Sequence, residues 1–578
     1  MSPTLLPMAP LRLPFDATLA MPGSKSHANR AIIAACLSKG QTIIDHATPC
    51  DDVVLLVTNL KKMGFVIRYK NQEKGTLVIR GGIPDNRHLK KPVRLYCGNA
   101  GTTVRFLTSL ACLVPGEFII TGNAAMLKRP IHDLTLALQR LGAEISDTNG
   151  YPPVRVSGRT MAGGRTALDR SKSSQYLTSL LLIGPSLQKG LSVELTGKAT
   201  SQPYIDLTRQ VLHDFGVTVR VHDGTASISN KARYKSPKHY EIEGDWSAAG
   251  AFWVLAELTS SRVSFSNLDS SSVQADAKLS HMIARMRQKG SIVIDCKDIP
   301  DQVMNLAALA GFRNGKTRII GAGNLRHKEC DRIEVLTKEF GKAGIRIDAQ
   351  DDGVVMYGES NLKHAALDPH DDHRMAFSFA ILGSIHPGIR IKNPACVSKS
   401  YPRFFEDLQR IHRSPLSIAI VGMRGCGKST LAEKLAARLH LKHLDTDRLF
   451  KRHHGSIRSF IKRHGWGAFR KYEEQIVGDN LKPGCVVSLG GGAIESAKTR
   501  GLLQKEAIVI HLEAPASLIA QRLRKGKRPA LTSLPLAQEV QLILKKRTPL
   551  YRDVARIRVR HSDSIPQIAR ILRNLCSL

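Results

Sequence analysis

The segment Gly422–Ser429, which reads GMRGCGKS, has the glycine, lysine and serine spacing of a phosphate-binding loop. It follows an apolar stretch, Leu416–Val421, that is typical of a buried strand, and leucines at every fourth position after it predict a helix. In such a loop the glycines let backbone N–H groups close around phosphate, and the helix N-terminus favours negative charge. We therefore expect Lys428 to reach the outer phosphates of a nucleotide and Ser429 to bind Mg²⁺.

Acidic residues, arginines and a glycine run follow this loop. Apolar stretches at Val486–Leu489 and Ile508–Leu512 alternate with helical segments, which is typical of a parallel sheet. Residues that suit anion, metal or hydroxyl binding occur, in chain order, at Asp445, Asp447, Arg470, Glu473, Gly490–Gly492, Arg528 and Arg547–Tyr551.

This order of residues, over the whole C-terminal segment, resembles shikimate kinase. The resemblance implies a nucleoside-monophosphate-kinase-like fold that uses ATP and Mg²⁺, with Lys428 as a catalytic residue. It implies shikimate binding by Asp447, Arg470, Gly491 and Arg547, and Mg²⁺ binding by Ser429 and Asp445. It implies ATP binding by Gly425, Cys426, Gly427, Lys428, Ser429, Thr430 and Arg528, the last from a mobile lid.

Each of these residues also has an ordinary structural explanation. The aspartates are typical of a helix cap or turn, the arginines of a solvated basic face, and the glycine run of a flexible turn. Their joint order favours the binding site. The stretch His561–Pro566 offers no recognisable counterpart of the family's adenine contact, so the nucleotide preference stays open.

The first 400 residues contain clusters of basic and small polar residues, many at glycine-rich turns, but no second P-loop motif. Small residues that precede a helix form an anion cradle from backbone N–H groups. Six or more Arg and Lys side chains in such turns suit a pair of ligands that carry several phosphates and carboxylates. The clusters are Pro22–Arg30, Gly98–Arg105, Lys128–Pro130, Ser173–Gln175, Ser201–Tyr204, Lys328–Arg332, Asp372–Met375 and Lys399.

The same part of the chain carries a repeated pattern. Helix-like segments end at Gly64, Gly142, Gly216, Gly290 and Gly344, which lie 78, 74, 74 and 54 residues apart, and alternating apolar residues follow each glycine. Glycine at the end of a helix takes the left-handed conformation cheaply, and period-2 alternation around a polar turn predicts a hairpin. The pattern therefore predicts a repeated helix–hairpin unit after each of the five glycines, although a glycine before a strand is common in any α+β protein.

The motifs PGSKS, GNAGT, RPI, SSQYL, SQPYID, KECDR and DDHRMA together resemble 5-enolpyruvylshikimate-3-phosphate (EPSP) synthase over about residues 10–410. The resemblance implies two domains of helix–hairpin units, of the inverse α/β barrel type, with the chain crossing between them near residues 22 and 244. The fold class we expect is therefore α/β and α+β multidomain, with a P-loop kinase and its parallel sheet after the two-domain synthase.

The resemblance also implies two sets of binding residues in this half. For shikimate 3-phosphate they are Lys25, Ser26, Arg30, Ser173, Ser174, Gln175, Ser201, Tyr204, Asp301, Asn324 and Lys328. For phosphoenolpyruvate they are Lys25, Asn99, Gly101, Arg129, Gln175, Arg332, Arg374 and Lys399. Phe106 stands where some family members have Pro, and we expect a packing change there without loss of activity.

The resemblance implies that Asp301 accepts a proton, that Glu329 is its acid–base partner and that Lys25 is catalytic. In the reaction a hydroxyl loses a proton while the enol carbon gains one, which two carboxylates with separately tuned pKa values can serve. No metal or other cofactor is expected for this half. Singly, Asp301 is also typical of a helix cap and Glu329 of an exposed helix start, and the stretch His370–His373 admits a metal-site interpretation that nothing else supports.

The charge of the chain is strongly positive. It carries 85 Lys and Arg against 49 Asp and Glu, a net +36, and residues 416–578 hold 31 basic and 12 acidic residues, a net +19. Nucleic acid, anionic membrane and small anionic substrates are the partners such charge suggests. Aromatic residues are 5% and no RNA- or DNA-binding motif occurs, so we expect small anions and no nucleic acid.

Other features suggest a cytoplasmic enzyme without a membrane partner. No apolar run approaches the roughly 18–20 residues that span a bilayer, and no secretory signal is recognisable at the N-terminus. The ten cysteines are scattered and form no CxxC pair, as expected for reduced thiols.

Taken together, the patterns predict a bifunctional enzyme of the shikimate pathway towards chorismate and aromatic amino acids. We expect an EPSP synthase-like region at 1–412 (subdomain I 1–21 plus 245–412, subdomain II 22–244), a linker at 413–415 and a kinase-like domain at 416–578. The expected partners are shikimate, shikimate 3-phosphate, phosphoenolpyruvate and ATP. A basic scaffold with vestigial sites, or a UDP-sugar enolpyruvyl transferase, are alternatives, but all the expected catalytic residues are present. Oligomeric state and channelling stay open.

Overall fold

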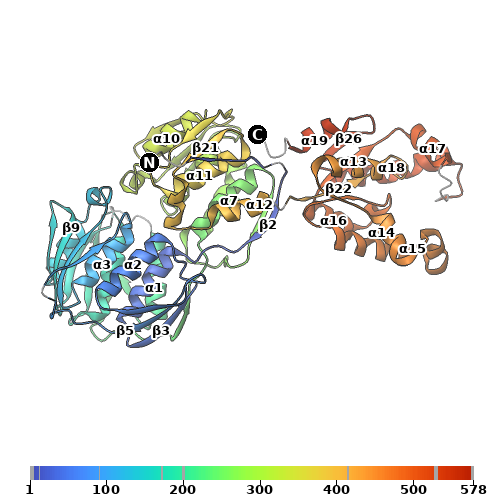
Figure 1. Ribbon diagram of the computed structural model, residues 1–578. Helices are drawn as coiled ribbons and strands as arrows, with labels where there is room; N and C mark the ends of the chain where they lie inside the picture. Colours follow the sequence, from blue (N-terminus) through green and yellow to red (C-terminus); the bar gives the residue numbers. More distant parts are fainter. Residues whose placement is uncertain are drawn as a thin grey trace. The chain divides into compact units, whose positions relative to one another are not determined.

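The computed structural model describes residues 5–11, 13–89, 91–170, 173–197, 202–412, 415–525 and 532–573 (Figure 1). The chain divides into two compact units. The first comprises Met1–Pro10, Thr18–Glu257 and Ser264–Phe404, and the second comprises Leu11–Ala17, Leu258–Val263 and Phe405–Leu578. The last of these boundaries falls after the first residue of the helix α12 (Phe404–His412). The domain limits expected from the sequence stay predictions.

Three four-stranded sheets of one topology form the part of the first unit between residues 22 and 244. In each sheet a parallel pair of strands continues into an antiparallel hairpin. The sheets are β14-β3-β5-β4 (His239–Glu241, Gly40–Asp45, Thr76–Gly81, Val66–Asn71), β6-β7-β9-β8 (Val93–Tyr96, Gly116–Thr121, Tyr151–Gly158, Glu144–Thr148) and β10-β11-β13-β12 (Gly164–Asp169, Leu191–Thr196, Thr225–Ile228, Arg220–His222). The repeat predicted from glycine spacing is present here.

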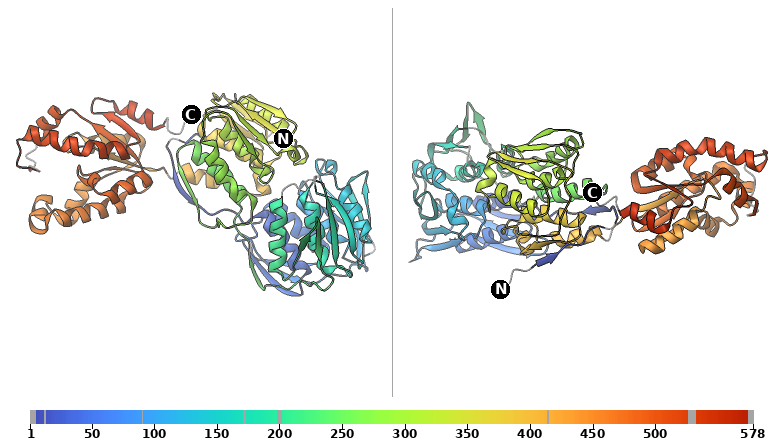
Figure 2. Two further views of the ribbon diagram at one scale, coloured as in Figure 1. Left: turned by 180° about the vertical axis from the view of Figure 1, so that it is seen from behind. Right: turned by 90° about the horizontal axis from the view of Figure 1, so that it is seen from above.

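The helices of this part lie inside, with the sheets around them (Figures 1 and 2). Helix α1 (Lys25–Leu37) buries 10 of its 13 residues and α5 (Ser174–Ile183) buries 9 of its 10, so neither has a polar outer face. Apolar residues fill the C-terminal part of both helices, Ala31–Leu37 and Leu180–Ile183, as expected of helices surrounded by protein. The other helices of this part are α2 (Asp51–Lys62), α3 (Gly101–Ala111), α4 (His132–Arg140) and α6 (Gln202–Asp214).

The rest of the first unit contains a fourth sheet of the same topology. It is β16-β17-β19-β18 (Ile292–Asp295, Thr317–Ile320, Gly353–Met356, Ile347–Gln350). A smaller sheet is β1-β21-β20 (Leu5–Pro7, Ile389–Lys392, Ala365–Leu367). The strands of the pair β15-β2 (Arg262–Phe265, Asp16–Leu19) each include residues assigned to both units. The helices are α7 (Trp246–Leu258), α8 (Leu279–Met286), α9 (Val303–Ala310), α10 (Arg332–Lys342) and α11 (His373–Ile385).

The hairpin expected after Gly290 is wrong. The φ of Gly290 is positive (82°), and φ is also positive at the other four glycines. However, the strand that follows Gly290, β16, pairs in parallel with β17. A parallel partner needs a crossover connection, which α9 supplies. Gly290 therefore precedes the outer strand of the fourth sheet, whereas Gly344 precedes its hairpin, and this explains the short spacing of 54 residues between them.

The two chain crossings expected near residues 22 and 244 lie side by side. Ser24 N donates to Glu243 O and Asp245 N donates to Pro22 O, both at 2.8 Å, and Gly23 forms an antiparallel bridge with Gly244. These contacts join the two segments at which the sequence predicts the chain crossings, and the crossings themselves stay predictions.

The second unit is built on a five-stranded parallel sheet with helices on both faces (Figure 2). The strand order is β23-β24-β22-β25-β26 (Lys442–Asp445, Cys485–Ser488, Ser417–Val421, Ala507–Glu513, Ile557–Arg560). The helices after α12 are α13 (Lys428–Leu439), α14 (Thr446–His454), α15 (Ile457–Asn480), α16 (Ala497–Glu506), α17 (Ala516–Lys525), α18 (Leu536–Val554) and α19 (Ile565–Arg573). All five residues of β22 are buried, as its unbroken apolar sequence predicts.

Candidate functional sites

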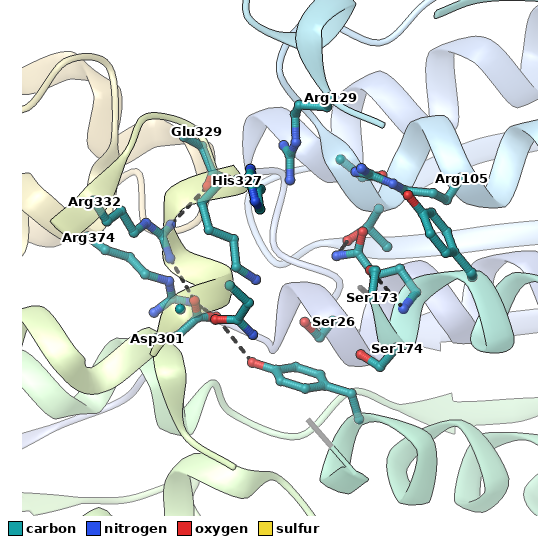
Figure 3. A pocket seen from close by; sticks show the side chains of 18 of the residues that line it. Ser26, Arg105, Arg129, Ser173, Ser174, Asp301, His327, Glu329, Arg332 and Arg374 are labelled. Carbon is teal, nitrogen blue, oxygen red and sulfur yellow. Dashed lines mark hydrogen bonds and ion pairs between the residues drawn. The ribbon is translucent and has the colours of Figure 1, made fainter. Parts of the chain in front are cut away.

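A cavity of about 720 Å³ lies in the first unit (Figure 3). It is lined by residues from two parts of the sequence, 25–204 and 295–374. Its lining carries eight Lys and Arg side chains and five Asp and Glu side chains, so its charge suits anionic ligands. Of the residues expected from the sequence, the lining includes Lys25, Ser26, Arg30, Gly101, Arg129, Ser173, Ser174, Gln175, Tyr204, Asp301, Asn324, Lys328, Glu329, Arg332 and Arg374.

Helix N-termini bring these residues together. Helices α1, α3 and α5 begin at Lys25, Gly101 and Ser174, and all three of these residues line the cavity. On the opposite side, Arg332 begins α10 and Arg374 is the second residue of α11. The free backbone N–H groups and the positive dipole end of each helix favour anions at such places. The repeated fold thus points several helix starts at one cavity.

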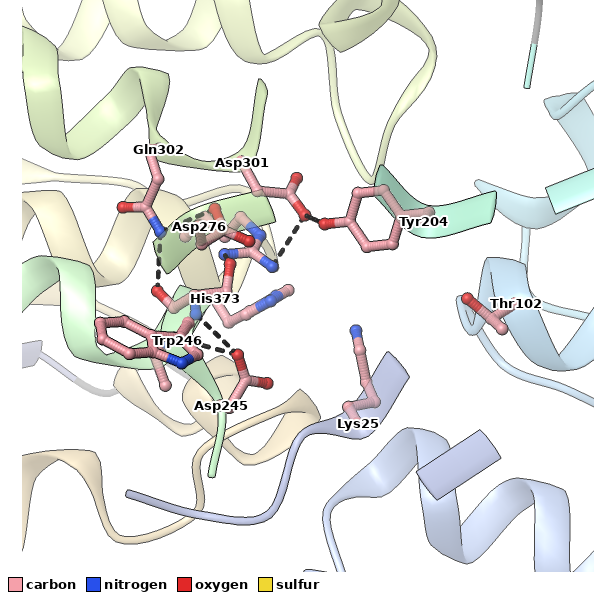
Figure 4. Close-up of polar contacts among 12 residues, drawn as sticks. Lys25, Thr102, Tyr204, Asp245, Trp246, Asp276, Asp301, Gln302 and His373 are labelled. Atoms are coloured by element: carbon pink, nitrogen blue, oxygen red, sulfur yellow. Dashed lines mark hydrogen bonds and ion pairs between the residues drawn. The ribbon is translucent and has the colours of Figure 1, made fainter. Parts of the chain in front are cut away.

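Asp301 sits between two arginines. Its oxygens lie 2.8 Å from Arg332 Nη1 and 2.9 Å from Arg374 Nη2, and Tyr204 donates its hydroxyl to Asp301 Oδ2 at 3.1 Å (Figures 3 and 4). Burial raises the pKa of Asp301, but the charges of Arg374, Arg332 and Lys328 outweigh burial and hold this pKa below its ordinary value. The carboxylate is therefore ionised at neutral pH and can accept a proton.

Glu329 shares Arg332 with Asp301. Glu329 Oε2 lies 2.9 Å from Arg332 Nη2, and its other oxygen lies 3.7 Å from Lys399 Nζ. Burial raises the pKa of Glu329, but Arg332, Lys399 and Arg129 lower it further than burial raises it. The two carboxylates expected from the sequence thus both pair with the Arg332 guanidinium. Burial lowers the pKa of Arg332, but Asp372, Glu329 and Asp301 raise this pKa well above its ordinary value.

Asp52 is a site residue that sequence reasoning missed. It is 2% exposed, and its oxygens lie 2.9 Å from Lys25 Nζ and 3.0 Å from Lys399 Nζ. Burial lowers the pKa of Lys25, yet Asp52 and Glu329 raise it more, so Lys25 stays charged. Asp52 adjoins Asp51 at the start of α2, where acidic residues are common, and nothing in the sequence separates the two.

Several cavity groups have no hydrogen-bond partner among the described residues although they are buried. They include Arg129 Nε and Nη1 and Asn324 Oδ1. Burial, with the neighbouring Arg105, lowers the pKa of Arg129 to about 10. Burial also lowers the pKa of Lys328. Buried polar groups without partners are rare in proteins. The two Arg129 donors belong to a residue that lines the cavity, which fits groups that a bound anion satisfies, whereas Asn324 Oδ1 is an acceptor.

Two expected residues lie behind the lining rather than in it. Lys399 donates to Asn99 O at 2.8 Å as well as to Asp52. Asn99 Oδ1 is buried and has no hydrogen-bond partner within the described ranges. Ser201, expected to contact shikimate 3-phosphate, lies outside the described residues.

Arg374 contacts a network of polar side chains, of which Gln302 and Asp276 are labelled in Figure 4. Its Nη1 donates to Ser247 Oγ at 2.6 Å, and Gln302 Nε2 donates to both Ser247 O (3.1 Å) and Asp276 Oδ1 (3.0 Å). Asp276 is 4% exposed. Burial, aided by the charge of Asp301, raises the pKa of Asp276 to about 7. The sequence contained no signal for this network.

The metal-site interpretation of His370–His373 finds no geometric support. Within the part of the chain that the structure describes, no group of three or more His, Cys, Asp or Glu side chains is arranged to hold a metal ion. Asp372 instead caps α11 through Arg374 N and pairs with Arg332 Nε at 2.6 Å.

In the second unit the P-loop joins β22 to α13, as predicted. Gly422, Gly425 and Gly427 have φ values of 148°, 83° and 110°, which residues other than glycine rarely adopt. Lys428 begins α13, and its Nζ donates to Met423 O at 3.1 Å. Arg522, which the sequence analysis did not single out, donates to Gly425 O and Cys426 O at 3.3 and 2.9 Å. Arg528 lies outside the described residues.

The two residues expected to bind Mg²⁺ are adjacent. Ser429 Oγ donates to Asp445 Oδ2 at 2.6 Å, and Ser488 Oγ donates to the same oxygen at 2.8 Å. A hydroxyl and a carboxylate at a P-loop are oxygen ligands that suit Mg²⁺ beside phosphates. Hydrogen bonds to the charged form hold the pKa of Asp445 below normal against the effect of burial.

The residues expected to bind shikimate gather at the carboxyl ends of β23 and β24. A Cβ built on Gly490 would lie 2.9 Å from Asp447 Oδ1, and one on Gly492 would lie 2.2 Å from Arg470 Nη2. Arg547 Nη1 donates to Gly491 O at 3.1 Å. A Cβ at Gly490 or Gly492 would therefore force the Asp447 carboxylate or the Arg470 guanidinium to move.

A second cavity, of about 380 Å³, lies beside the P-loop at the carboxyl ends of β25 and β26. Met423, Ala514 and Pro515 line it together with His561 and Ser562, the stretch that the sequence could not place.

The chain therefore contains two sites of the kind that transfer groups between anionic ligands. One is a cationic cavity in which two carboxylates pair with the same arginine, and the other is a P-loop at a parallel sheet, next to a cluster of arginines and an aspartate. The family model for EPSP synthase (3-phosphoshikimate 1-carboxyvinyltransferase) matches residues 12–408, and that for shikimate kinase matches residues 424–576. The chain belongs to the EPSP synthase family and carries a shikimate kinase domain after it.

Individual relatives agree. The 3-phosphoshikimate 1-carboxyvinyltransferase of Psychromonas ingrahamii is 33% identical over 414 residues, which are 68% of this chain and 97% of the relative. The pentafunctional AROM polypeptide of Clavispora lusitaniae is 32% identical over 85% of this chain, which spans only 36% of that polypeptide. The EPSP synthase structure of Acinetobacter baumannii superposes with a TM-score of 0.59 at 24% identity, covering 70% of this chain and 98% of that one, and shows the shared fold.

The expected fold class and the expected fusion of two shikimate-pathway enzymes are therefore confirmed. No helix in the described part of the chain is long and apolar enough to span a membrane.

Proposed function

We propose that the second unit phosphorylates shikimate with ATP and that the first unit joins the resulting shikimate 3-phosphate to phosphoenolpyruvate, giving 5-enolpyruvylshikimate 3-phosphate and phosphate. The observation that carries the second step is the placement of Asp301 and Glu329 on one guanidinium, across the cavity from the starts of α1, α3 and α5. Basic donors surround the cavity, and each substrate brings a phosphate and a carboxylate.

In the first unit, the helix starts at Lys25, Ser174 and Gln175 receive shikimate 3-phosphate with Arg30, Tyr204 and Lys328. Arg129, Arg332 and Arg374 receive phosphoenolpyruvate, together with Lys399, which reaches the site from behind Asn99. The unpartnered donors of Arg129 favour this role, since a phosphate or carboxylate satisfies them.

The proton traffic follows from the two carboxylates. Asp301 is ionised in the free protein and takes the proton of the attacking hydroxyl of shikimate 3-phosphate. The oxygen of that hydroxyl forms a bond to the enol carbon that carries the phosphate. The methylene carbon gains a proton, and a tetrahedral ketal forms. That proton then leaves again as the C–O bond to phosphate breaks and the enol is restored. Glu329 and the charged Lys25 serve the methylene side, and the arginines stabilise the departing phosphate. No cofactor takes part in this scheme.

In the second unit, the P-loop amides and Lys428 hold the ATP phosphates. Ser429 and Asp445 hold Mg²⁺, which neutralises phosphate charge when bound. Asp447 lies beside the acceptor hydroxyl, and Arg470 and Arg547 hold the carboxylate of shikimate. The cavity lined by His561 and Ser562 takes the nucleotide base because it continues from the P-loop at Met423.

We further place the enzyme in the cytoplasm, with small anions as its partners and neither nucleic acid nor membrane. The nine cysteines within the described residues are free and mostly buried, which suits a reducing compartment.

A coupled assay tests the proposal. Purified protein with shikimate, ATP and Mg²⁺ is expected to accumulate shikimate 3-phosphate, and addition of phosphoenolpyruvate is expected to convert it to the enolpyruvyl product, identified by mass spectrometry, with release of one phosphate. Failure of folded protein to form either compound contradicts the assignment of the corresponding unit.

A further inference from the structure

Glu495 occupies the space between the two arginines to which we assign the shikimate carboxylate. It ends the short 3-10 helix Ala493–Glu495 that follows the glycine run. Its Oε2 lies 3.2 Å from Arg547 Nη2 and 3.6 Å from Arg470 Nη2. Its Oε1 lies 2.8 Å from Lys546 Nζ. One protein carboxylate thus contacts both guanidinium groups.

The contacts of the two arginines leave their Nη2 atoms for this carboxylate. Arg547 Nη1 is engaged with Gly491 O, and Arg470 Nη1 is engaged with Glu473. Each guanidinium also carries an Nε–H group, but Nη2 is the atom that faces Glu495. A substrate carboxylate that bridges the same two side chains through their Nη2 atoms competes with Glu495 for these donors.

Glu473 and Glu495 differ in how firmly they are held. The side chain of Glu473 is 6% exposed, as expected of a fixed partner for Arg470, whereas that of Glu495 is 26% exposed. Lys546, whose side chain is 70% exposed, pairs with the other oxygen of Glu495 on the solvent side. Glu495 therefore has a second cationic partner, Lys546, on the solvent side, whereas Glu473 is enclosed beside Arg470.

We propose that Glu495 is an internal stand-in for the substrate carboxylate: it neutralises Arg470 and Arg547 in the free enzyme, and shikimate must displace it towards Lys546 in order to bind. Glu495 thereby sets the affinity of the kinase site for carboxylate substrates. This inference rests on the proposed roles of Arg470 and Arg547. It predicts that removing the charge of Glu495 tightens shikimate binding, whereas a purely structural ion pair predicts no change or weaker binding.

The test is the dissociation constant of shikimate for the full-length protein, measured by calorimetry without nucleotide. Trp466 gives a second readout, since it is the one tryptophan between residues 415 and 578 and its ring lies 5.4 Å from the Arg470 guanidinium. Glu495→Gln is expected to lower the dissociation constant about three- to tenfold, an effect of the size of one to two exposed ion pairs. The KM for shikimate is expected to fall in parallel.

Three controls separate the possible causes. Asp479→Asn removes an exposed acid of the same unit and is expected to leave binding unchanged. Glu495→Ala excludes hydrogen bonding by the glutamine amide. Shikimate methyl ester, which lacks the negative charge, is expected to bind Glu495→Gln and the parent protein equally. Binding of ATP, measured by calorimetry in the absence of shikimate, reports that the second unit of each variant is folded.

Unchanged or weaker shikimate binding by both Glu495 variants, with ATP binding retained, overturns the inference. Arg547→Ala distinguishes this from failure of the proposed function. If Arg547→Ala weakens shikimate binding while the Glu495 variants do not tighten it, only the role of Glu495 is wrong. If Arg547→Ala also leaves binding unchanged, the assignment of the shikimate site itself is wrong.

Discussion

Lys25 Nζ lies 2.9 Å from Asp52 Oδ2, and both side chains are almost entirely enclosed. The second oxygen of Asp52 pairs with Lys399 Nζ. One buried acid thus binds two lysines from distant parts of the chain, one in the lining of the transferase cavity and one behind it. The pair explains how Lys25 keeps its charge despite burial, which alone lowers its pKa.

Asp52→Asn is expected to reduce kcat/KM of the transferase step by about tenfold or more, because loss of one partner leaves a buried cation unpaired. Kinase activity of the same variant is expected to stay within about twofold of the parent. Both rates follow from separate assays with shikimate 3-phosphate or shikimate as the starting substrate. A folded variant with normal transferase activity contradicts this role for Asp52.

Gly101→Ala is expected to raise the KM for phosphoenolpyruvate by about tenfold with a smaller change in kcat. A Cβ at this position would stand 2.5 Å from Arg105 Nη1 and 2.7 Å from Arg129 Nη2, so the guanidinium groups must move. Gly341→Ala on α10 is the matched control, because no atom lies within 4 Å of its added Cβ. Equal KM values in Gly101→Ala and the parent count against the placement of phosphoenolpyruvate at Arg129.

Asp276→Asn is expected to stabilise the first unit more at pH 8 than at pH 5. The folded pKa of about 7 exceeds the ordinary aspartate value, so the folded chain keeps a proton that the unfolded chain releases. The contribution of the protonated carboxyl is therefore fully present below about pH 4 and is lost as the pH rises through 7. An asparagine at this position does not ionise, so the variant does not lose stability in this way as the pH rises.

Thermal unfolding of the variant and the parent at both pH values measures this effect. The gain in Tm on substitution is expected to be larger by about 2 °C or more at pH 8. Asp223→Asn, whose side chain is 86% exposed, serves as the control. A gain independent of pH means that Asp276 is ionised in the folded protein.

Ser429→Ala is expected to increase the Mg²⁺ concentration that half-saturates the kinase reaction, by about tenfold, because a hydroxyl ligand beside Asp445 is lost. The transferase reaction is expected to be insensitive to Mg²⁺ in both proteins. A Mg²⁺ dependence unchanged by the substitution places the ion away from Ser429.

The sequence predicted those parts of the fold and sites that depend on local patterns. The P-loop between β22 and α13 and the residues that begin α1, α3 and α5 follow from motifs in which glycine and small polar residues precede a helix. The helix–hairpin repeat followed from glycine spacing, except at Gly290, where a strand with a parallel partner has the same local signature as the first strand of a hairpin.

Residues whose role depends on contacts between distant segments were missed. Asp52 is distinguished from Asp51 only by its burial against Lys25 and Lys399, which lie 27 and 347 residues away in sequence. Asp276 and Glu495 are likewise ordinary acids in the sequence. Their significance arises from the buried polar network in one case and from two converging arginines in the other, and neither follows from local residue patterns.

The central claim, two separate anion sites in one chain that catalyse consecutive steps, is tested most directly by Lys428→Ala and Asp301→Ala in the full-length protein. Rates of both steps are measured for both variants. Lys428→Ala is expected to lower the kinase rate by at least about a hundredfold and to leave the transferase rate within about twofold, and Asp301→Ala is expected to do the reverse. Loss of both activities in either folded variant contradicts the account.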